Sequence, residues 1–256
     1  MIKSFISAFL MYSRLPMPKV EWKEENRRYS LCFFPLIGAV IGGLFLLWYY
    51  VCIQLNINTL IFGAGGMLIP IAVTGGIHLD GFCDVSDARA SCGDKERKLQ
   101  IMSDSHIGAF AAIKLVAYLI LQTALFSGLC GLRYTAIAGC SFVLSRALSA
   151  VAAVTFRSAK NNGALQSFVR PSHKRITIVM LSITIILTCG GMLLLSPVSG
   201  GAAAAAALLS MVYYRHVSYK EFGGITGDLA GWFLQICEIM TAAAIVFSER
   251  AAEVLK

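Results

Sequence analysis

Long apolar blocks separated by short charged segments dominate the chain. Seven such blocks lie at residues 31–53, 57–77, 107–128, 132–154, 176–196, 199–214 and 229–248. Most have about the twenty residues that a helix needs to cross a bilayer. The block at 199–214 is short, which favours a tilted or partly buried helix. The pattern predicts an all-α, polytopic membrane helix bundle with about seven transmembrane helices, within a range of six to eight.

The N-terminal segment follows a different pattern. Apolar side chains from Phe5 to Leu10 recur at helical spacing, and Pro16 and Pro18 follow soon after. This segment is too short to span a bilayer and is typical of a helix that lies in the membrane interface. No linker or low-complexity tail divides the rest of the chain. We therefore expect residues 1–256 to form a single integral membrane domain.

The composition excludes an ordinary water-soluble globule. Apolar residues make up 57% of the chain and charged residues only 14%, against roughly a quarter charged in soluble domains. The net charge is +8, but no basic stripe with interleaved aromatic residues indicates a nucleic-acid partner. Anionic lipid headgroups are the simpler explanation of the charge. Membrane lipid is thus the expected partner, and homo-oligomerisation is left open.

The basic residues predict which side of the membrane each loop faces. If the N-terminus is cytoplasmic, 17 Lys and Arg side chains lie on the cytoplasmic side and three (Arg133, Arg250 and Lys256) on the other. Basic residues near span ends favour the cytoplasm, so this split sets the orientation. The same assignment puts 11 of the 14 acidic residues on the cytoplasmic side, which indicates that the working surface faces the cytoplasm.

A cluster of carboxylates follows the second apolar block. Asp80, Asp84 and Asp87 stand at i, i+4 and i+7, so a helix would place them on one face. Three like charges repel unless a cation is shared among them, and hard oxygen ligands suit Mg²⁺ or Mn²⁺. We expect a metal site here. The alternative is a solvated acidic helix end.

Two further residues belong to the same region. Asp104 precedes the third block, where it could cap that helix, act as a fourth ligand or serve as the general base for an attacking hydroxyl. His78 falls on the opposite side of the carboxylate helix from Asp80. We expect His78 to contribute to substrate binding from behind the carboxylates.

A glycine-rich turn precedes the last apolar block. Gly223, Gly224 and Gly227 lead into Asp228 at the expected start of a helix, where free backbone N–H groups favour phosphate. The segment does not have the P-loop pattern. We expect the glycines to bind substrate phosphate. Asp228 is then either a catalytic residue or a further metal ligand.

Four further charged residues have predicted roles. Glu238 lies deep in the last block and needs a buried partner, for which Arg146 is the candidate. That pair is either purely structural or functional. Arg14 and Arg157, both on the cytoplasmic side of the expected topology, are candidate phosphate-binding residues.

Several motifs together resemble the cobalamin synthase family, also called the adenosylcobinamide-GDP ribazoletransferases. They are SRLPMP, FFPLIGAVIGG, GGIHLDGFCDVSDA, IMSDSHIGAF and GGITGDLAGWFLQICE, in the order of the family. The resemblance implies a multi-pass, Mg²⁺-dependent transferase of the cell (inner) membrane with a cytoplasmic active site. Its substrates would be adenosylcobinamide-GDP and α-ribazole or α-ribazole 5′-phosphate. Its products would be GMP and adenosylcobalamin or its phosphate, a late step of cobalamin (cobamide) biosynthesis.

The resemblance carries over to most of the candidate acidic residues. The matching positions are Asp80, Asp84, Asp87, Asp104, Asp228 and Glu238. The chain departs from the expected pattern at His106, Ser103 and Gln235, where an Arg, a basic residue and a Glu were expected. We prefer Asp104 as the general base, with Asp228 as the alternative.

Two other classes of protein use acidic residues in a similar setting. A divalent cation transporter would hold its site near the midplane of broken helices, whereas six of the seven relevant acids here are expected at one membrane face. A CDP-alcohol-type phospholipid phosphotransferase performs comparable chemistry, but its DxxDGxxAR signature is absent from the chain.

Overall fold

The computed structural model describes residues 1–104, 106–160 and 163–254, so Lys256 lies outside the described part of the chain. Twelve helices make up the fold there, and the described residues contain no β-strand beyond a single parallel bridge between Ser158 and Ile225. The helices are α1 (Ile2–Tyr12), α2 (Glu24–Arg27), α3 (Ser30–Gln54), α4 (Thr59–Thr74), α5 (Ile77–Ala90), α6 (Lys95–Ile101), α7 (Ala109–Ser127), α8 (Leu132–Thr155), α9 (Ala164–Val169), α10 (Lys174–Leu195), α11 (Pro197–Glu221) and α12 (Gly227–Val254).

The number of membrane-spanning helices agrees with the prediction. Within the described residues, six helices are long and apolar enough to cross a membrane: α3, α7, α8, α10, α11 and α12. The pair α4–α5 passes the same test only when the two helices are joined, which would make seven. The short apolar N-terminal helix is present as α1. The all-α membrane bundle is therefore confirmed.

The largest difference from a predicted boundary is at the end of the sixth block. The block at 199–214 corresponds to α11, which continues to Glu221 and has 25 residues. Its last turns are stabilised by contacts that hydropathy does not detect, because the Arg215 guanidinium lies over the rings of Phe156 and Tyr219 at 5.7 and 5.4 Å. Apolar content indicates only where a helix stops being compatible with lipid. Helix α11 itself ends seven residues after that point, at Glu221.

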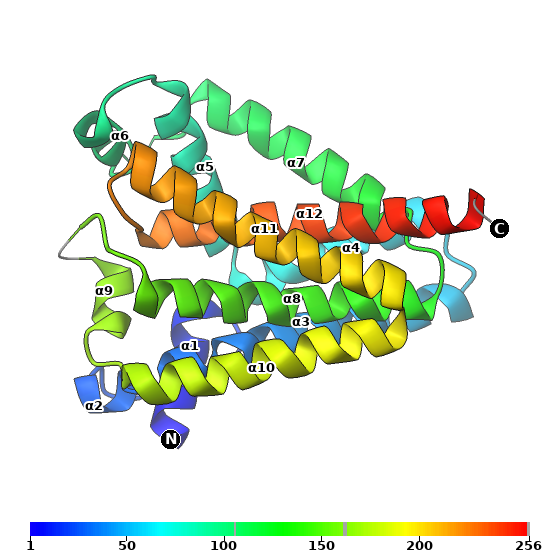
Figure 1. The fold of residues 1–256 in the computed structure, drawn as a ribbon, viewed down its shortest axis with the longest axis horizontal. Coiled ribbons are helices and arrows are strands. Elements are labelled where there is room, and N and C mark those ends of the chain that lie inside the picture. Colours follow the sequence, from blue (N-terminus) through cyan, green and yellow to red (C-terminus); the bar gives the residue numbers. More distant parts are fainter. Residues whose placement is uncertain (105, 161–162, 255–256) are drawn as a thin grey trace.

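The charged connections gather at one end of the bundle. Figure 1 shows α3, α8, α10, α11 and α12 running along the long axis, while α1, α2, α5, α6 and α9 lie toward the left-hand end. The α10–α11 turn and the C-terminal end of α12 lie at the opposite end. This arrangement agrees with the alternation of charged and apolar segments, since the predicted cytoplasmic segments share one end.

Small residues allow close helix packing in the core. A side chain at Gly38 or Gly42 of α3 would overlap the backbone of α8 at Phe142 or Gly139. Such small residues let helix backbones approach closely in a membrane, where dispersion contacts and hydrogen bonds hold helices together. Helix α8 is the most buried span, whereas α10 is mostly exposed on the surface of the bundle.

A sharp bend separates α4 from α5. Gly75 and Gly76 both have positive φ, at 67° and 81°, which glycine adopts without the steric cost of a Cβ. The two helices meet at 97°. Helix α5 therefore does not continue the direction of α4, and lies near α6 toward the left-hand end of the bundle (Figure 1). This bend places the predicted carboxylate helix at the end of the bundle where the charged connections gather.

Candidate active site

Helices α5 and α12 cross at very short range. A Cβ at Gly81 of α5 would lie 2.7 Å from the Asp228 carbonyl oxygen and 2.8 Å from its Cα. A Cβ at Gly231 of α12 would lie 3.1 Å from the carbonyl oxygen of His78. Only residues without a side chain permit this approach. The crossing thus brings the N-terminus of α12 against the acidic face of α5.

Four carboxylates interact at this crossing. The pKa of Asp84 is raised from 3.8 to about 7, first by burial and then by the nearby negative charges of Asp80, Asp228 and Asp87, in that order. The i, i+4, i+7 spacing on one helix is confirmed, because α5 runs unbroken from Ile77 to Ala90. Asp228 joins this group from α12, as the sequence suggested it could.

Asp87 also caps the N-terminus of α7. Its carboxylate accepts hydrogen bonds from the backbone N–H groups of Gly108, at 2.6 Å, and Ala111, at 2.8 Å. A Cβ at Gly108 would lie 2.6 Å from the Asp87 Oδ1 atom. Sequence reasoning missed this role. The available signal was a helix starting after Gly108 with no Ser, Thr, Asn or Asp at its N-cap.

The acidic group suits a cation shared with substrate. Among the residues that the structure describes, no three His, Cys, Asp or Glu side chains are grouped closely enough to hold one metal ion. Mg²⁺ in enzymes commonly uses one or two carboxylates and completes its shell with water and phosphate oxygens. The repelling carboxylates therefore fit an ion held jointly with phosphate, and do not fit an ion enclosed by protein alone.

Two hollows of different character meet at Asp80. An apolar cavity of about 120 Å³ is lined by His78, Asp80, Gly227 and Asp228 together with aliphatic and aromatic side chains. A more open and polar groove of about 630 Å³ is lined by Arg14, the Gly75–Gly76 bend and Asp80. The predicted substrate-binding residues His78 and Arg14 thus line two different hollows that share Asp80.

Arg157 and the glycine turn are brought together. The Ile225 N–H donates to the Arg157 carbonyl at 2.9 Å, and the Arg157 Nε donates to the Gly223 carbonyl at 3.0 Å. Gly224 packs so closely on this strand-like segment that a Cβ would lie 2.5 Å from the Arg157 carbonyl oxygen. The predicted phosphate-binding residue Arg157 and the predicted glycine turn therefore belong to one structural unit next to Asp228.

Lys160 supplies positive charge near the carboxylates. Its Nζ donates to the Ser103 Oγ at 2.9 Å, and its charge acts on Asp228. The family resemblance led us to expect a basic residue at position 103. Ser103 stands at that position, and the ammonium group of Lys160, which comes from another loop, lies against it.

Asp104 lies apart from this group. Its side chain is 59% exposed and lies 2.7 Å from His106 Nδ1, and the hydrogen bond from His106 lowers the pKa of Asp104. It lines neither the cavity nor the groove. A general base must reach the proton it removes. The geometry therefore favours Asp228 over Asp104 for that role.

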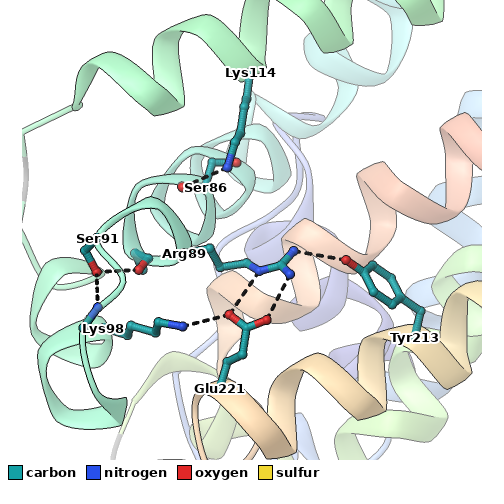
Figure 2. Close-up of polar contacts among 9 residues, drawn as sticks. Ser86, Arg89, Ser91, Lys98, Lys114, Tyr213 and Glu221 are labelled. Atoms are coloured by element: carbon teal, nitrogen blue, oxygen red, sulfur yellow. Dashed lines mark hydrogen bonds and ion pairs between the residues drawn. The ribbon is translucent and has the colours of Figure 1, made fainter.

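A salt-bridge network holds α5 and α6 to the end of α11. Glu221 accepts from Arg89 Nη2 and from Lys98 Nζ, each at 2.9 Å, and Figure 2 shows both cations pointing toward it. Arg89 also donates to the Tyr213 hydroxyl at 3.2 Å. On the other side of α5, Lys114 of α7 donates to the Ser86 carbonyl at 3.2 Å. The network fixes the carboxylate helix from two neighbouring elements.

The predicted pairing of Glu238 with Arg146 is confirmed. Arg146 Nη1 lies 2.5 Å from Glu238 Oε1, and the two side chains are 1% and 3% exposed. Arg146 Nη1 also donates to the Phe142 carbonyl at 3.1 Å. The pair joins α8 to α12 inside the bundle.

These features define a class: an integral membrane protein whose helix bundle carries a polar, enzyme-like site at one end. A family model described as cobalamin-5-phosphate synthase matches residues 4–246. The chain belongs to this family of enzymes.

Relatives named adenosylcobinamide-GDP ribazoletransferase match along nearly the whole chain. An adenosylcobinamide-GDP ribazoletransferase of Lachnoclostridium phytofermentans is 44% identical over 248 residues, covering 97% of this chain and 95% of the relative. One from Clostridium botulinum (strain Alaska E43) is 32% identical, covering 94% and 95%. One from Acinetobacter baumannii is 31% identical, covering 94% of each chain. No solved structure matches the chain.

Proposed function

We propose that this protein joins adenosylcobinamide-GDP to α-ribazole or α-ribazole 5′-phosphate, releasing GMP. The observation that carries the proposal is the shared wall at Asp80, where a polar groove with a basic residue meets a separate apolar cavity. A transferase needs two substrates to meet at one reacting atom, and two adjoining hollows of opposite polarity provide for this.

The reaction is a phosphoryl transfer from a pyrophosphate to a hydroxyl. A ribose hydroxyl oxygen forms a new bond to the phosphorus that carries the corrinoid, and the bond from that phosphorus to the bridging oxygen of GMP breaks. The hydroxyl proton passes to a carboxylate, for which we propose Asp228. Positioning and charge neutralisation supply most of the catalysis in reactions of this type.

We propose Mg²⁺ as the cofactor, held by Asp80 and Asp84 together with phosphate oxygens. When bound, the ion neutralises negative charge that develops on the phosphate. Asp87 of α5, which caps α7, adds its negative charge to the acidic group. We propose that Arg14 in the groove, and Arg157 with the glycines 223, 224 and 227, bind substrate phosphate. Asp104 is retained only as the alternative base.

We further propose that this end of the bundle faces the cytoplasm across the cell membrane. The 17 to three division of basic residues supports this orientation. The nucleotide-activated donor is charged, so an active site on the side where nucleotides are made is chemically consistent.

The test is turnover by the purified protein in detergent. Wild type is incubated with adenosylcobinamide-GDP, α-ribazole and Mg²⁺, and the corrinoid product and GMP are quantified. Asp228→Asn should lower kcat by about 10²–10⁴-fold, the range for loss of a general base, whereas Asp104→Asn should remain within about tenfold of wild type. No product from wild type, or a greater loss in Asp104→Asn, contradicts the proposal. Metal flux in proteoliposomes without corrinoid would support a transporter instead.

A further inference from the structure

A second and much smaller cavity shares His78 with the candidate active site. It has a volume of about 10 Å³ and lies between α4, α5, α8 and α12. Its polar lining residues are Thr74, His78, Arg146 and Gln235, and none of them is more than 7% exposed. The remaining lining side chains are apolar. A cavity of this size has room for one water molecule and for nothing larger.

Two nitrogen atoms in this lining have no hydrogen-bond partner among the described residues. They are Nε2 of His78 and Nε of Arg146. Arg146 uses Nη1 to bind Glu238, and its Nε takes no part in that contact. The Thr74 hydroxyl already donates to the Pro70 carbonyl at 2.7 Å. Buried waters typically make about three hydrogen bonds to polar groups that are otherwise unsatisfied. Two such groups around one water-sized cavity therefore indicate a water as its ligand.

Arg146 determines the direction of the hydrogen bonds. A guanidinium nitrogen can only donate, so a water in this cavity accepts from Arg146 Nε and donates its own two hydrogens. His78 Nε2 and the side-chain oxygen of Gln235 are acceptors in the same lining. At position 235 the family resemblance predicted a Glu, and the amide keeps an acceptor oxygen without adding a second carboxylate to the buried pair. A neutral imidazole that accepts at Nε2 carries its proton on Nδ1.

His78 also lines the larger cavity at the carboxylates, together with Asp80 and Asp228. Its ring packs edge-to-face against Phe34, with the ring centroids 6.0 Å apart. Ionised carboxylates accept hydrogen bonds and cannot donate them. An N–H group at Nδ1 is therefore compatible with the acidic lining, whereas a lone pair there would add repulsion. The tautomer of His78 thus connects the small cavity to the active site.

We infer that one buried water bridges Arg146 to His78, and that Arg146 and Gln235 are positioning residues that hold His78 in its Nδ1–H tautomer. The Nδ1–H group then donates to a substrate oxygen in the larger cavity. The Arg146–Glu238 pair gains a role beyond joining α8 to α12, because the Glu238 carboxylate holds the guanidinium that orients the water. The water bridge stands on the geometry alone, and only the contact with substrate rests on the proposed function.

The tautomer of His78 is the direct readout. Nitrogen-15 NMR of the full chain in detergent, labelled at its four histidines, distinguishes protonated from unprotonated ring nitrogens, and the His78 signals are assigned by their loss in His78→Gln. Arg146→Met/Glu238→Leu removes the fixed donor without leaving an unpaired charge. Gln235→Leu fills the cavity and removes an acceptor. Gln122→Leu is the matched control, because it makes the same substitution at a buried position that lines a different small cavity.

The inference predicts both the tautomer and the water. Wild type and Gln122→Leu should carry the His78 proton on Nδ1, and a density map at a resolution that shows ordered water should contain one water in the cavity. Gln235→Leu should lose that water. Arg146→Met/Glu238→Leu should shift His78 toward the Nε2–H tautomer, because the water is then free to accept from that atom. The inference is overturned if wild type lacks the water or carries the proton on Nε2, or if the folded variants leave both properties unchanged.

Turnover measured on the same preparations separates this inference from the proposed function. Folded Arg146→Met/Glu238→Leu should turn over about 10- to 100-fold more slowly than wild type, as when a metal-binding histidine loses the outer partner that fixes its tautomer, and Gln122→Leu should match wild type. Wild type with the water and the Nδ1–H tautomer but no corrinoid product would refute the proposed reaction and leave the positioning assignment intact. Normal turnover by wild type with His78 protonated on Nε2 would refute the assignment and leave the reaction intact.

Discussion

The Asp87 carboxylate accepts a hydrogen bond from the backbone N–H of Gly108 at 2.6 Å, and so ties the carboxylate helix to the start of α7. A second bond comes from Ala111. We predict that Asp87→Ala lowers the free energy of unfolding by about 0.5–2 kcal/mol, the usual cost of losing a helix cap. Thermal unfolding in detergent measures this.

A second variant of this residue, Asp87→Asn, distinguishes the cap from a metal ligand. Because both Asp87 oxygens already accept backbone N–H groups, Asp87→Asn should shift the Mg²⁺ concentration for half-maximal turnover much less than Asp84→Asn does. Equal shifts in the two variants, with no loss of stability in Asp87→Ala, would show that Asp87 acts as a ligand and that its capping contacts contribute little.

The Arg146–Glu238 pair leads to a prediction about stability. Removing one member of a buried pair leaves an uncompensated charge and costs about 3–5 kcal/mol, whereas replacing both with apolar residues is often close to neutral. We expect Glu238→Leu to unfold well below the wild-type temperature, and Arg146→Met/Glu238→Leu to recover most of the loss. Turnover of the double variant within about tenfold of wild type assigns the pair a structural role. A stable but inactive double variant would indicate a functional one.

The interacting carboxylates predict an unusual pH dependence of stability. Folding raises the pKa of Asp84 from 3.8 to about 7, so between these values the folded state binds more protons than the unfolded state. Stability contributed by this group is therefore present at low pH and is lost as pH rises through about 7. Without divalent cations, Asp84→Asn should be more stable than wild type at pH 8, by about 1 kcal/mol after solvent screening.

Thermal unfolding at pH 5.5 and pH 8, with and without Mg²⁺, tests this prediction. Mg²⁺ should stabilise the wild type at pH 8 and stabilise Asp84→Asn far less, because the variant lacks the repulsion that the cation relieves. A variant that is less stable than wild type at pH 8 in the absence of Mg²⁺ would show that the Asp84 carboxylate has favourable partners.

The sequence was most informative where a pattern is local. The acidic ridge of α5 depends only on helical spacing, and the burial of Glu238 follows from its depth in an apolar block. Asp87 was harder, since its partner Gly108 lies 21 residues away and backbone N–H groups leave no trace in composition. Asp104 was hard to predict for a different reason. A short motif identified it as a candidate base, but the conformation of its loop determines whether its carboxylate reaches the site.

Gly81 provides the sharpest test of the site geometry. Because a Cβ there would lie 2.7 Å from the Asp228 carbonyl oxygen, Gly81→Ala must push α5 away from α12. We expect a loss of about 1–3 kcal/mol from overpacking. Turnover should fall by up to about 100-fold even where the protein is folded, since a displacement near 1 Å is enough to misplace reacting groups.

Gly43→Ala is the matched control for this substitution. Gly43 lies on the exposed face of α3 and a Cβ there would meet no atom within 4 Å, so the variant should keep wild-type turnover and gain about 0.4–1 kcal/mol through a less flexible unfolded chain. Turnover and thermal unfolding are measured for both variants side by side. If Gly81→Ala behaved like Gly43→Ala, the close crossing of α5 and α12 would not be what brings Asp228 to the other carboxylates.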